Sequence, residues 1–143
     1  STGTWFVAMR RPDGVDALPV LTEARDCLLN VDAFGAQTPS SRFMGGREIE
    51  ILSGVDPQRI DIKPDQPKLV AALPQILADG ARVLPTFAPG FGPFPQGEGR
   101  WVNRPDDPYA WRAAVCLYVA LVADAALDLI GARRALLVEG RFA

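Results

Sequence analysis

One long apolar stretch, residues 106–140, constrains the fold of this chain more than any other part of it. Asp106, Asp107 and Pro108 make a strong helix start, because Asp can accept hydrogen bonds from first-turn amides and Pro at the first helical position gives up no needed donor. Residues 109–130 contain neither Gly nor Pro, and their middle is apolar on nearly every side. The pattern predicts a helix that is buried on more than one face.

The residues after this helix predict a stop followed by a short buried strand. Gly131 suits the left-handed end of a helix, and Arg133 and Arg134 provide a polar break. Residues 135–138, Ala-Leu-Leu-Val, are typical of a strand covered on both faces, as parallel strands are. We expect the helix and strand to be the second half of a βαβ-type crossover against which the other elements pack.

Composition limits the class of protein. A chain of 143 residues with 48% apolar and 22% charged residues predicts one globular domain with a real core. The net charge of -2 and the lack of a Lys/Arg run argue against a nucleic-acid partner. No histidine is present, which excludes histidine catalysis and histidine metal sites.

Membrane and redox signals are weak. The apolar run is interrupted by Asp124 and falls short of the about 20 residues that a membrane span needs, and no signal peptide is seen, so we expect no membrane partner. Cys27 and Cys116 lie far apart without metal-type spacing. We expect both to be reduced core thiols of a cytoplasmic protein.

Before the long helix, the pattern predicts an alternation of strands and helices. Turn chemistry is expected at residues 11–14 and at Gly35, and an exposed connection at residues 56–66. The expected strands are 4–9, 28–32 and 42–44, with an extended segment at 83–87, and the expected helices are 47–52, ending at Gly54, and 68–78, which Pro74 should kink or shorten.

Three glycine-bearing turns are the candidates for chemistry. They are residues 1–4 (Ser-Thr-Gly-Thr), residues 90–99, and Glu139 with Gly140. Each adjoins an extended segment, so they could converge at one sheet edge, where α/β proteins place ligands. Small residues let phosphate oxygens reach backbone amides, and a Thr hydroxyl adds a donor. Taken singly, each is more often an ordinary strand-entry or sheet-edge turn.

Other motifs have two interpretations each. The Gly-, Pro- and Phe-rich loop at residues 87–101 either buries its aromatic rings against the domain or forms a wall for a nucleotide or sugar. Residues 45–47, Gly-Gly-Arg, could bind an anion at a helix start, although a solvated Arg47 is the simpler interpretation. Glu48 and Glu50 lie on opposite sides of a short helix, so we expect surface charges and no acid/base pair.

The order of these motifs resembles the second domain of the FGGY carbohydrate kinases. Residues 1–5 (Ser-Thr-Gly-Thr-Trp) are most similar to the fuculokinase and rhamnulokinase branches. Residues 85–94 resemble the glycerol-kinase run of Phe-Pro-Ala-Phe, Gly-Leu and Ala-Pro-Tyr-Trp. The Ala-rich helix and then Leu-Leu-Val-Glu-Gly at residues 136–140 complete the order. The resemblance covers nearly the whole chain.

The resemblance implies an α/β fold, a ribonuclease-H-like, actin-like ATPase lobe with a mixed sheet. Residues 1–143 would be a single domain and the early part of the C-terminal lobe, incomplete as given. By resemblance, Gly3 and Thr4 meet the ATP phosphates. Gly90 and Gly92 lie in the loop beside the nucleotide, and Gly140 lies near the adenosine.

The implied activity is ATP-dependent phosphorylation of a small sugar, a ketose or related compound, by the parent protein. The cofactors would be ATP and Mg, bound with the sugar in the cleft between two lobes. The family's catalytic Asp lies upstream of Ser1, so the segment alone should be inactive and carries no catalytic or metal-ligating residue of its own. The expected partners are the sugar and the missing N-terminal lobe, and a homodimer stays open.

Two alternatives to a kinase stay open. Glu139 stands where the family usually has Gly, which gives weight to a catalytically inactive actin-like scaffold or sugar-sensing module. An Asp shortly upstream of Ser1 would favour the kinase over that module. A self-sufficient small α/β domain would instead melt cooperatively as residues 1–143 alone.

Overall fold

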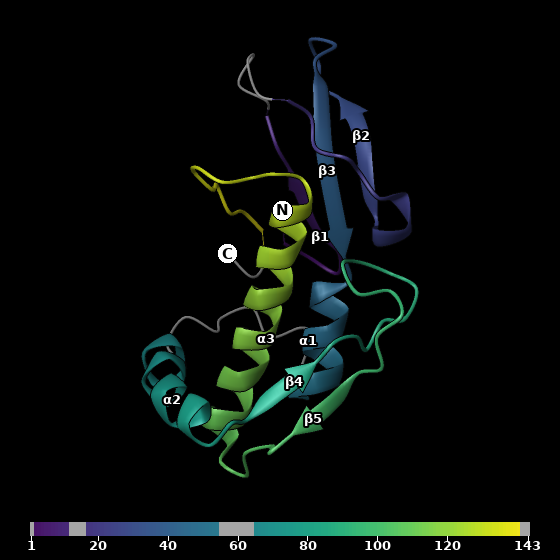
Figure 1. Cartoon of the computed structure of the whole chain (residues 1–143). Coiled ribbons are helices and arrows are strands. Elements are labelled where there is room, and N and C mark those ends of the chain that lie inside the picture. Colours follow the sequence, from purple (N-terminus) through teal and green to yellow (C-terminus); the bar gives the residue numbers. More distant parts are fainter. Residues whose placement is uncertain (1, 12–16, 55–64, 141–143) are drawn as a thin grey trace.

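Helix α3 (Pro108–Leu129) lies at the centre of the molecule, and the other elements are arranged around it (Figure 1). The structure is a computed structural model that describes residues 2–11, 17–54 and 65–140. The expected turn at residues 11–14 and connection at residues 56–66 lie mostly outside this range. The other elements are β1 (Phe6–Met9), the 3-10 helix η1 (Glu23–Arg25), β2 (Cys27–Val31), β3 (Gln37–Phe43), α1 (Gly45–Ser53), α2 (Gln66–Ala78), β4 (Arg82–Leu84) and β5 (Arg100–Val102).

Both ends of α3 are as the sequence predicts. The Asp107 side chain accepts a hydrogen bond from the Ala110 amide at 2.8 Å, which makes it the N-cap. At the other end Gly131 has φ +68, and its amide donates to the Asp128 carbonyl. The left-handed conformation there is one that side chains other than Gly rarely adopt, so the helix has to stop.

The strands form two small antiparallel sheets. In the larger sheet β3 lies between β1 and β2, with Phe6 opposite Phe43 and Cys27 opposite Ser41. In the smaller sheet β4 pairs with β5. Strand β3 begins five residues before the predicted 42–44. The polar residues before Phe43 are part of the strand because they pair with β2, and the buried Ser41 hydroxyl donates to the Ala126 carbonyl at 2.7 Å. Strand β5 overlaps the end of the predicted loop at residues 87–101.

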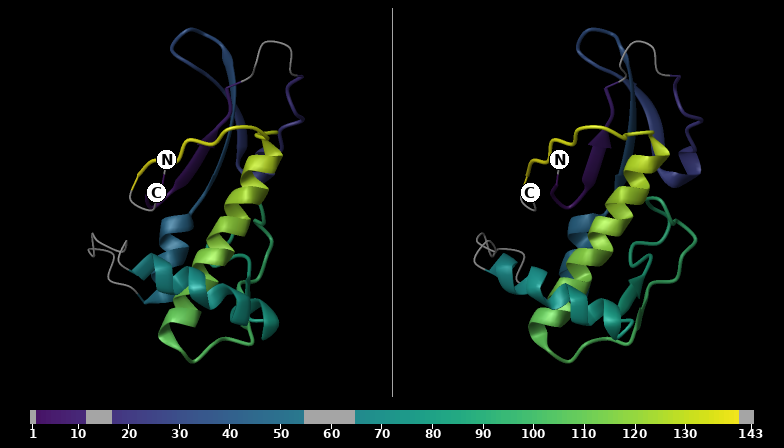
Figure 2. Two further views of the ribbon diagram at one scale, coloured as in Figure 1. Left: turned by 90° about the vertical axis from the view of Figure 1, so that its left-hand side faces the viewer. Right: turned by 60° about the vertical axis from the view of Figure 1, so that its left-hand side comes forward.

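The predicted strand at residues 135–138 is wrong. This segment runs close to β1 (Figure 2). Among the described residues it forms no strand, and the nearest backbone pairing is one parallel bridge between Thr2 and Gly140. The side chains of Leu136 and Leu137 are 62% and 88% exposed. An all-apolar strand is stabilised when both of its faces are covered, and the described part of the chain leaves this segment uncovered. The expected crossover is therefore not completed.

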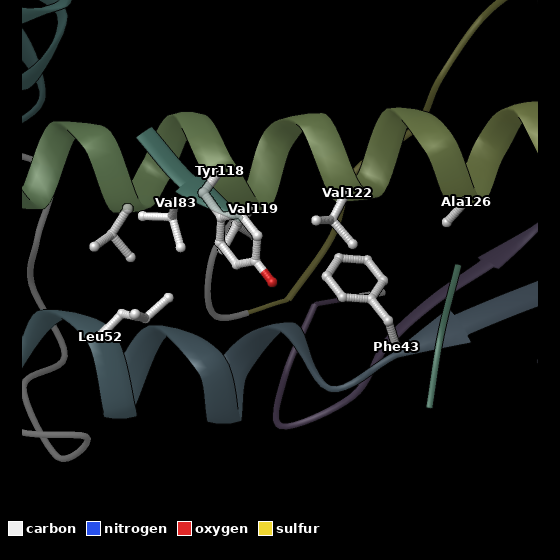
Figure 3. Packing of buried hydrophobic residues seen from close by; sticks show 8 residues of the cluster. Phe43, Leu52, Val83, Tyr118, Val119, Val122 and Ala126 are labelled. Carbon is white, nitrogen blue, oxygen red and sulfur yellow. The ribbon is translucent and has the colours of Figure 1, made fainter. Parts of the chain in front are cut away.

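The core lies between α1, α3 and the end of β3. Figure 3 shows the side chains of the two helices meeting there, with the Phe43 ring beside Val122. A smaller cluster forms where α2 packs on the start of α3, so α3 is buried on two sides there. Helix α2 runs through Pro74 to Ala78 and is not shortened by it. The cluster in Figure 3 consists of Phe43, Leu52, Val83, Val115, Tyr118, Val119, Val122 and Ala126.

The opposite face of α3 is open. Cys116 is exposed, which corrects the expectation of a core thiol. The reason is that Cys116 lines a groove and not the packed core. Cys27 is buried as expected, and burial raises the pKa of its thiol. Neither cysteine forms a disulfide.

The length of helix α3 corrects the expectation about a membrane span. With 22 residues and an apolar composition it is long enough to cross a membrane, contrary to the expectation of a run that is too short. A central helix of a globular core meets the same criterion. Here α3 packs on two helices and on β3 and β4, which accounts for its apolar composition.

The Asp107 cap predicts a simple stability difference. Asp107→Ala should lower the free energy of unfolding by about 1 kcal/mol, because the Ala110 amide loses its acceptor. The neighbouring variant Asp106→Ala should change it by less than half as much. Urea titration followed by circular dichroism measures both, and equal effects of the two variants would contradict the assigned cap.

Candidate functional site

The first and third predicted glycine turns meet at the start of β1. The Thr2 amide and the Thr2 Oγ1 hydroxyl both donate to the Glu139 carbonyl, at 2.7 and 3.0 Å. Gly140 has φ +108, and a Cβ placed there would overlap the Thr2 carbonyl oxygen. Gly140 is therefore required by close backbone approach, and it lies directly beside Thr2 and the Gly3 turn.

Helix α1 begins against the same turn. The Gly46 amide donates to the Thr4 carbonyl at 3.2 Å, and a Cβ on Gly46 would overlap the Gly3 carbonyl. Gly3 itself is different, since a Cβ there would meet only the Trp5 carbonyl oxygen at 3.9 Å. Thr4 is exposed. The outer side of Gly3 and Thr4 is thus open, while their inner side is fixed by α1.

The second glycine turn reaches this region through aromatic contacts. The Phe91 ring meets the Trp5 ring edge-on, with centroids 5.3 Å apart, and Trp5 directly follows Thr4. Gly90 has φ +87, and a Cβ placed there would meet no atom within 4 Å, so its outer side is open. The loop that carries Gly90 therefore lies on the other flank of the turn that contains Gly3.

The amide and the α-carbon of Gly92 both make contacts within the chain. Its amide donates to Asp26 Oδ2 at 2.7 Å, and a Cβ there would press on the Phe43 side chain. Asp26 Oδ1 also pairs with Arg42 Nε at 3.1 Å, and the Arg42 guanidinium lies 4.9 Å from the centre of the Trp5 ring. A nucleotide at Gly92 would therefore make van der Waals contact and no hydrogen bond with the Gly92 amide, because this amide already donates to Asp26.

The structure thus gathers the predicted site residues around the start of β1. Gly140 pairs with Thr2, which directly precedes Gly3 and Thr4, and the loop of Gly90 and Gly92 approaches through the contact of Phe91 with Trp5. Whether each of them contacts a nucleotide stays a prediction.

Glu48 is the residue that sequence reasoning missed. It was expected at the surface, but it is only 2% exposed. Its Oε1 accepts hydrogen bonds from the Thr86 hydroxyl and from the Phe87 amide at 2.8 Å, and its Oε2 accepts one from the Tyr118 hydroxyl at 3.0 Å. Glu48 precedes the core residue Leu52 by four positions, so helical spacing alone places both on one face. That spacing was the available signal.

The neighbouring charges behave as expected. Glu50 lies on the outer side of α1 and pairs with Arg47 at 3.5 Å. The Arg47 side chain is 57% exposed, in agreement with a solvated Arg. The helix start at residues 45–47 therefore contributes close packing on Gly3 and the hydrogen bond from the Gly46 amide to the Thr4 carbonyl.

The Tyr118 hydroxyl is held as a neutral donor. Figure 3 shows its oxygen pointing from α3 toward α1. Burial raises the pKa of Tyr118 far above its ordinary value, and the negative charge of Glu48 and the hydrogen bond to it raise this pKa further. The hydroxyl therefore stays protonated and stabilises the buried carboxylate.

Removing this donor predicts a loss of stability. Tyr118→Phe should lower the free energy of unfolding by about 1–3 kcal/mol, because a buried carboxylate loses a partner. The control is Tyr109→Phe, whose hydroxyl accepts a hydrogen bond from Lys68 at the surface, and it should cost less than about 0.5 kcal/mol. Denaturant titration of both variants is the measurement, and equal losses would contradict a buried role for Tyr118.

The same pair predicts a pH dependence. The folded-state pKa of Tyr118 lies above the unfolded value of 10.0, so its contribution is complete below pH 10 and is lost as the pH rises further. The stability difference between the wild type and Tyr118→Phe should therefore shrink above pH 10. A difference that grows with pH would contradict the raised pKa.

Acidic and sulfur side chains do not gather into a metal site in the part of the chain that the structure describes: no three of His, Cys, Asp and Glu lie close enough to hold an ion. The amides of Gly3, Gly90 and Gly92 already donate within the chain, to the Trp5 carbonyl, the Pro95 carbonyl and Asp26 Oδ2. What the described residues offer a ligand is the exposed Thr4 and the open sides of Gly3 and Gly90. An exposed Thr side chain and backbone without a Cβ suit the close approach of a phosphate more than a bare cation.

Comparison with known proteins points to one family. The sequence profile described as "Carbohydrate kinase FGGY, C-terminal domain" matches residues 1–143. A crystal structure of a carbohydrate kinase from Novosphingobium aromaticivorans is 60% identical in sequence with a TM-score of 0.92, over 99% of this chain. The match covers 30% of that protein's chain, so this chain spans less than a third of its relative. None of the curated proteins matches the chain.

Proposed function

Because the chain belongs to the FGGY carbohydrate kinases, whose C-terminal domain is an actin-like, ribonuclease-H-like ATPase lobe, we propose that it supplies part of the ATP-binding lobe of a sugar kinase. The parent protein would transfer the γ-phosphoryl group of ATP to a small sugar, a ketose or related compound. The isolated segment would be inactive, because the family's catalytic Asp belongs to a part of the protein upstream of Ser1.

The observation that carries this proposal is the open side of Gly3. At Gly46 and Gly140 close backbone neighbours explain why no Cβ is tolerated. Nothing in the described chain requires glycine at position 3, where a Cβ would be accommodated. A glycine that packing does not require, next to the exposed Thr4, is what close approach of a phosphate to the backbone needs.

The cofactors would be ATP and Mg. Mg, when bound, would neutralise the phosphate charge, and its ligands would come from outside this chain. The residues of the chain would position the nucleotide: Gly3 and Thr4 at the phosphates, Gly90 and Gly92 beside the nucleotide, and Gly140 near the adenosine. Phosphoryl transfer depends mainly on such positioning and on charge stabilisation, so residues that position the nucleotide are what this lobe would have to supply.

The parent protein would work in the cytoplasm, with the sugar and an N-terminal lobe as partners. An exposed apolar groove supports the view that residues 1–143 are part of a larger lobe. The groove of about 1640 Å³ lies between β1, α3 and residues 132–139. Its wall includes Leu136 and Leu137, which are largely exposed in this chain.

The phosphate role of Gly3 is tested in the full-length protein by Gly3→Ala. We expect an increase of at least about tenfold in the Kd for a non-hydrolysable ATP analogue, because the methyl group occupies the phosphate approach. The melting temperature should stay the same, since the Cβ has room. Gly46→Ala, by contrast, should lower the melting temperature. Calorimetric titration measures the affinity, and a wild-type protein that binds no ATP analogue at millimolar concentration would overturn the kinase proposal.

The open groove predicts self-association of residues 1–143 in isolation. Exposed apolar surface of this extent favours contact between copies. Leu137→Ser should shift the sedimentation profile toward monomer, whereas Phe34→Ser, at an equally exposed site outside the groove, should not. A wild-type monomer that melts cooperatively would instead support a self-sufficient domain.

A further inference from the structure

The first turn of α1 contacts two parts of the site at once. At one position the Gly46 amide binds the Thr4 carbonyl of the N-terminal turn. Two residues later the Glu48 carboxylate binds the Phe87 amide and the Thr86 hydroxyl, where the Gly-, Pro- and Phe-rich loop at residues 86–99 begins. One helical turn therefore links the open glycine at position 3 with the base of this loop.

We propose that Glu48 is a positioning residue, which fixes the loop at residues 86–99 relative to the Gly3 turn so that both present their open glycines to one nucleotide. This inference rests on the proposed kinase function. Glu48 acts through the loop, because it is 2% exposed and both of its oxygens are bound to protein groups. Both of its oxygens already have protein partners inside the core, which favours an indirect role.

The chemistry of the position supports a role beyond stability. Burying a carboxylate is costly unless it is fully hydrogen-bonded, and a well-packed apolar side chain often stabilises such a position as well or better. An apolar side chain, however, could not bind the Phe87 amide. The Glu48 carboxylate binds two donors of the loop and one donor of α3.

The far side of the loop is held independently. Asp26 accepts the Gly92 amide, and Arg25 Nε donates to the Pro93 carbonyl at 2.7 Å. The loop is thus anchored at residues 86–87 and again at residues 92–93. Gly90, between the two anchors, has open space on its outer side. Loss of the Glu48 anchor should let the first part of the loop move while the second part stays in place.

The conservative variant Glu48→Gln separates positioning from direct chemistry. The Gln carbonyl oxygen can accept from Phe87 and Thr86, and its NH₂ group can donate to the Tyr118 oxygen. All three contacts can therefore persist without the charge. A catalytic base or metal ligand would lose its function in this variant, whereas a positioning residue would keep it.

The experiment uses the full-length protein with its sugar substrate. Glu48→Ala should raise the KM for ATP about tenfold, since small displacements of positioning groups weaken binding strongly, while the KM for the sugar stays within about twofold. Glu48→Gln should restore the KM for ATP to within about threefold of wild type. The matched control is Glu50→Ala on the outer face of the same helix, which should leave both values unchanged.

Amide hydrogen exchange provides a second readout that does not depend on activity. In Glu48→Ala the Phe87 amide should exchange at least about tenfold faster, whereas the Gly92 amide, which Asp26 holds, should keep its rate. If Glu48→Ala does not fold, Thr86→Val removes one of the two loop contacts of Glu48, together with the acceptor of the Ala88 amide within the loop, and should raise the KM for ATP in the same direction.

The outcomes are distinguishable from failure of the proposed function. A wild-type protein without sugar kinase activity overturns that function, and the nucleotide part of this inference with it. An active wild type whose KM for ATP is unchanged by Glu48→Ala overturns the positioning role alone. Loss of kcat in Glu48→Gln as large as in Glu48→Ala would also overturn it, in favour of direct participation.

Discussion

The arrangement of this chain depends on one buried carboxylate between two helices. Glu48 on α1 and Tyr118 on α3 meet inside the core, where the apolar side chains of both helices also pack. Because a buried charge needs partners, the position of α1 relative to α3 is fixed by directional bonds as well as by apolar contact. The same carboxylate takes two donors from the loop at residues 86–99, so the core and the candidate site share one anchor.

The glycines of the site have two physical origins. Gly46 and Gly140 lie where two backbones approach too closely for a Cβ, and Gly92 packs on the Phe43 side chain. Gly3 has no such neighbour, and Gly90, whose φ of +87 already favours glycine, has none on its outer side either. A motif that looks uniform in sequence thus divides into glycines that build the turn and glycines that leave it accessible. This division locates the accessible face of the site.

Sequence reasoning was most reliable where a local signal decides the structure. The cap at Asp107, the stop at Gly131 and the α/β class follow from capping chemistry and periodicity. It failed where a partner far away decides. Residues 135–138 have the composition of a buried strand, yet their state depends on whether something covers them. Cys116 is apolar in context but lies on the face of α3 that borders the groove.

The sequence by itself determined the order of glycine turns, helix and apolar segment that marks the family, because those motifs are local and ordered along the chain. Only the tertiary structure decided that Glu48 is buried. Burial of a charge depends on donors that are brought to it from distant positions, here Thr86, Phe87 and Tyr118. No local pattern encodes such a meeting, since it arises when α1, α3 and the loop pack together.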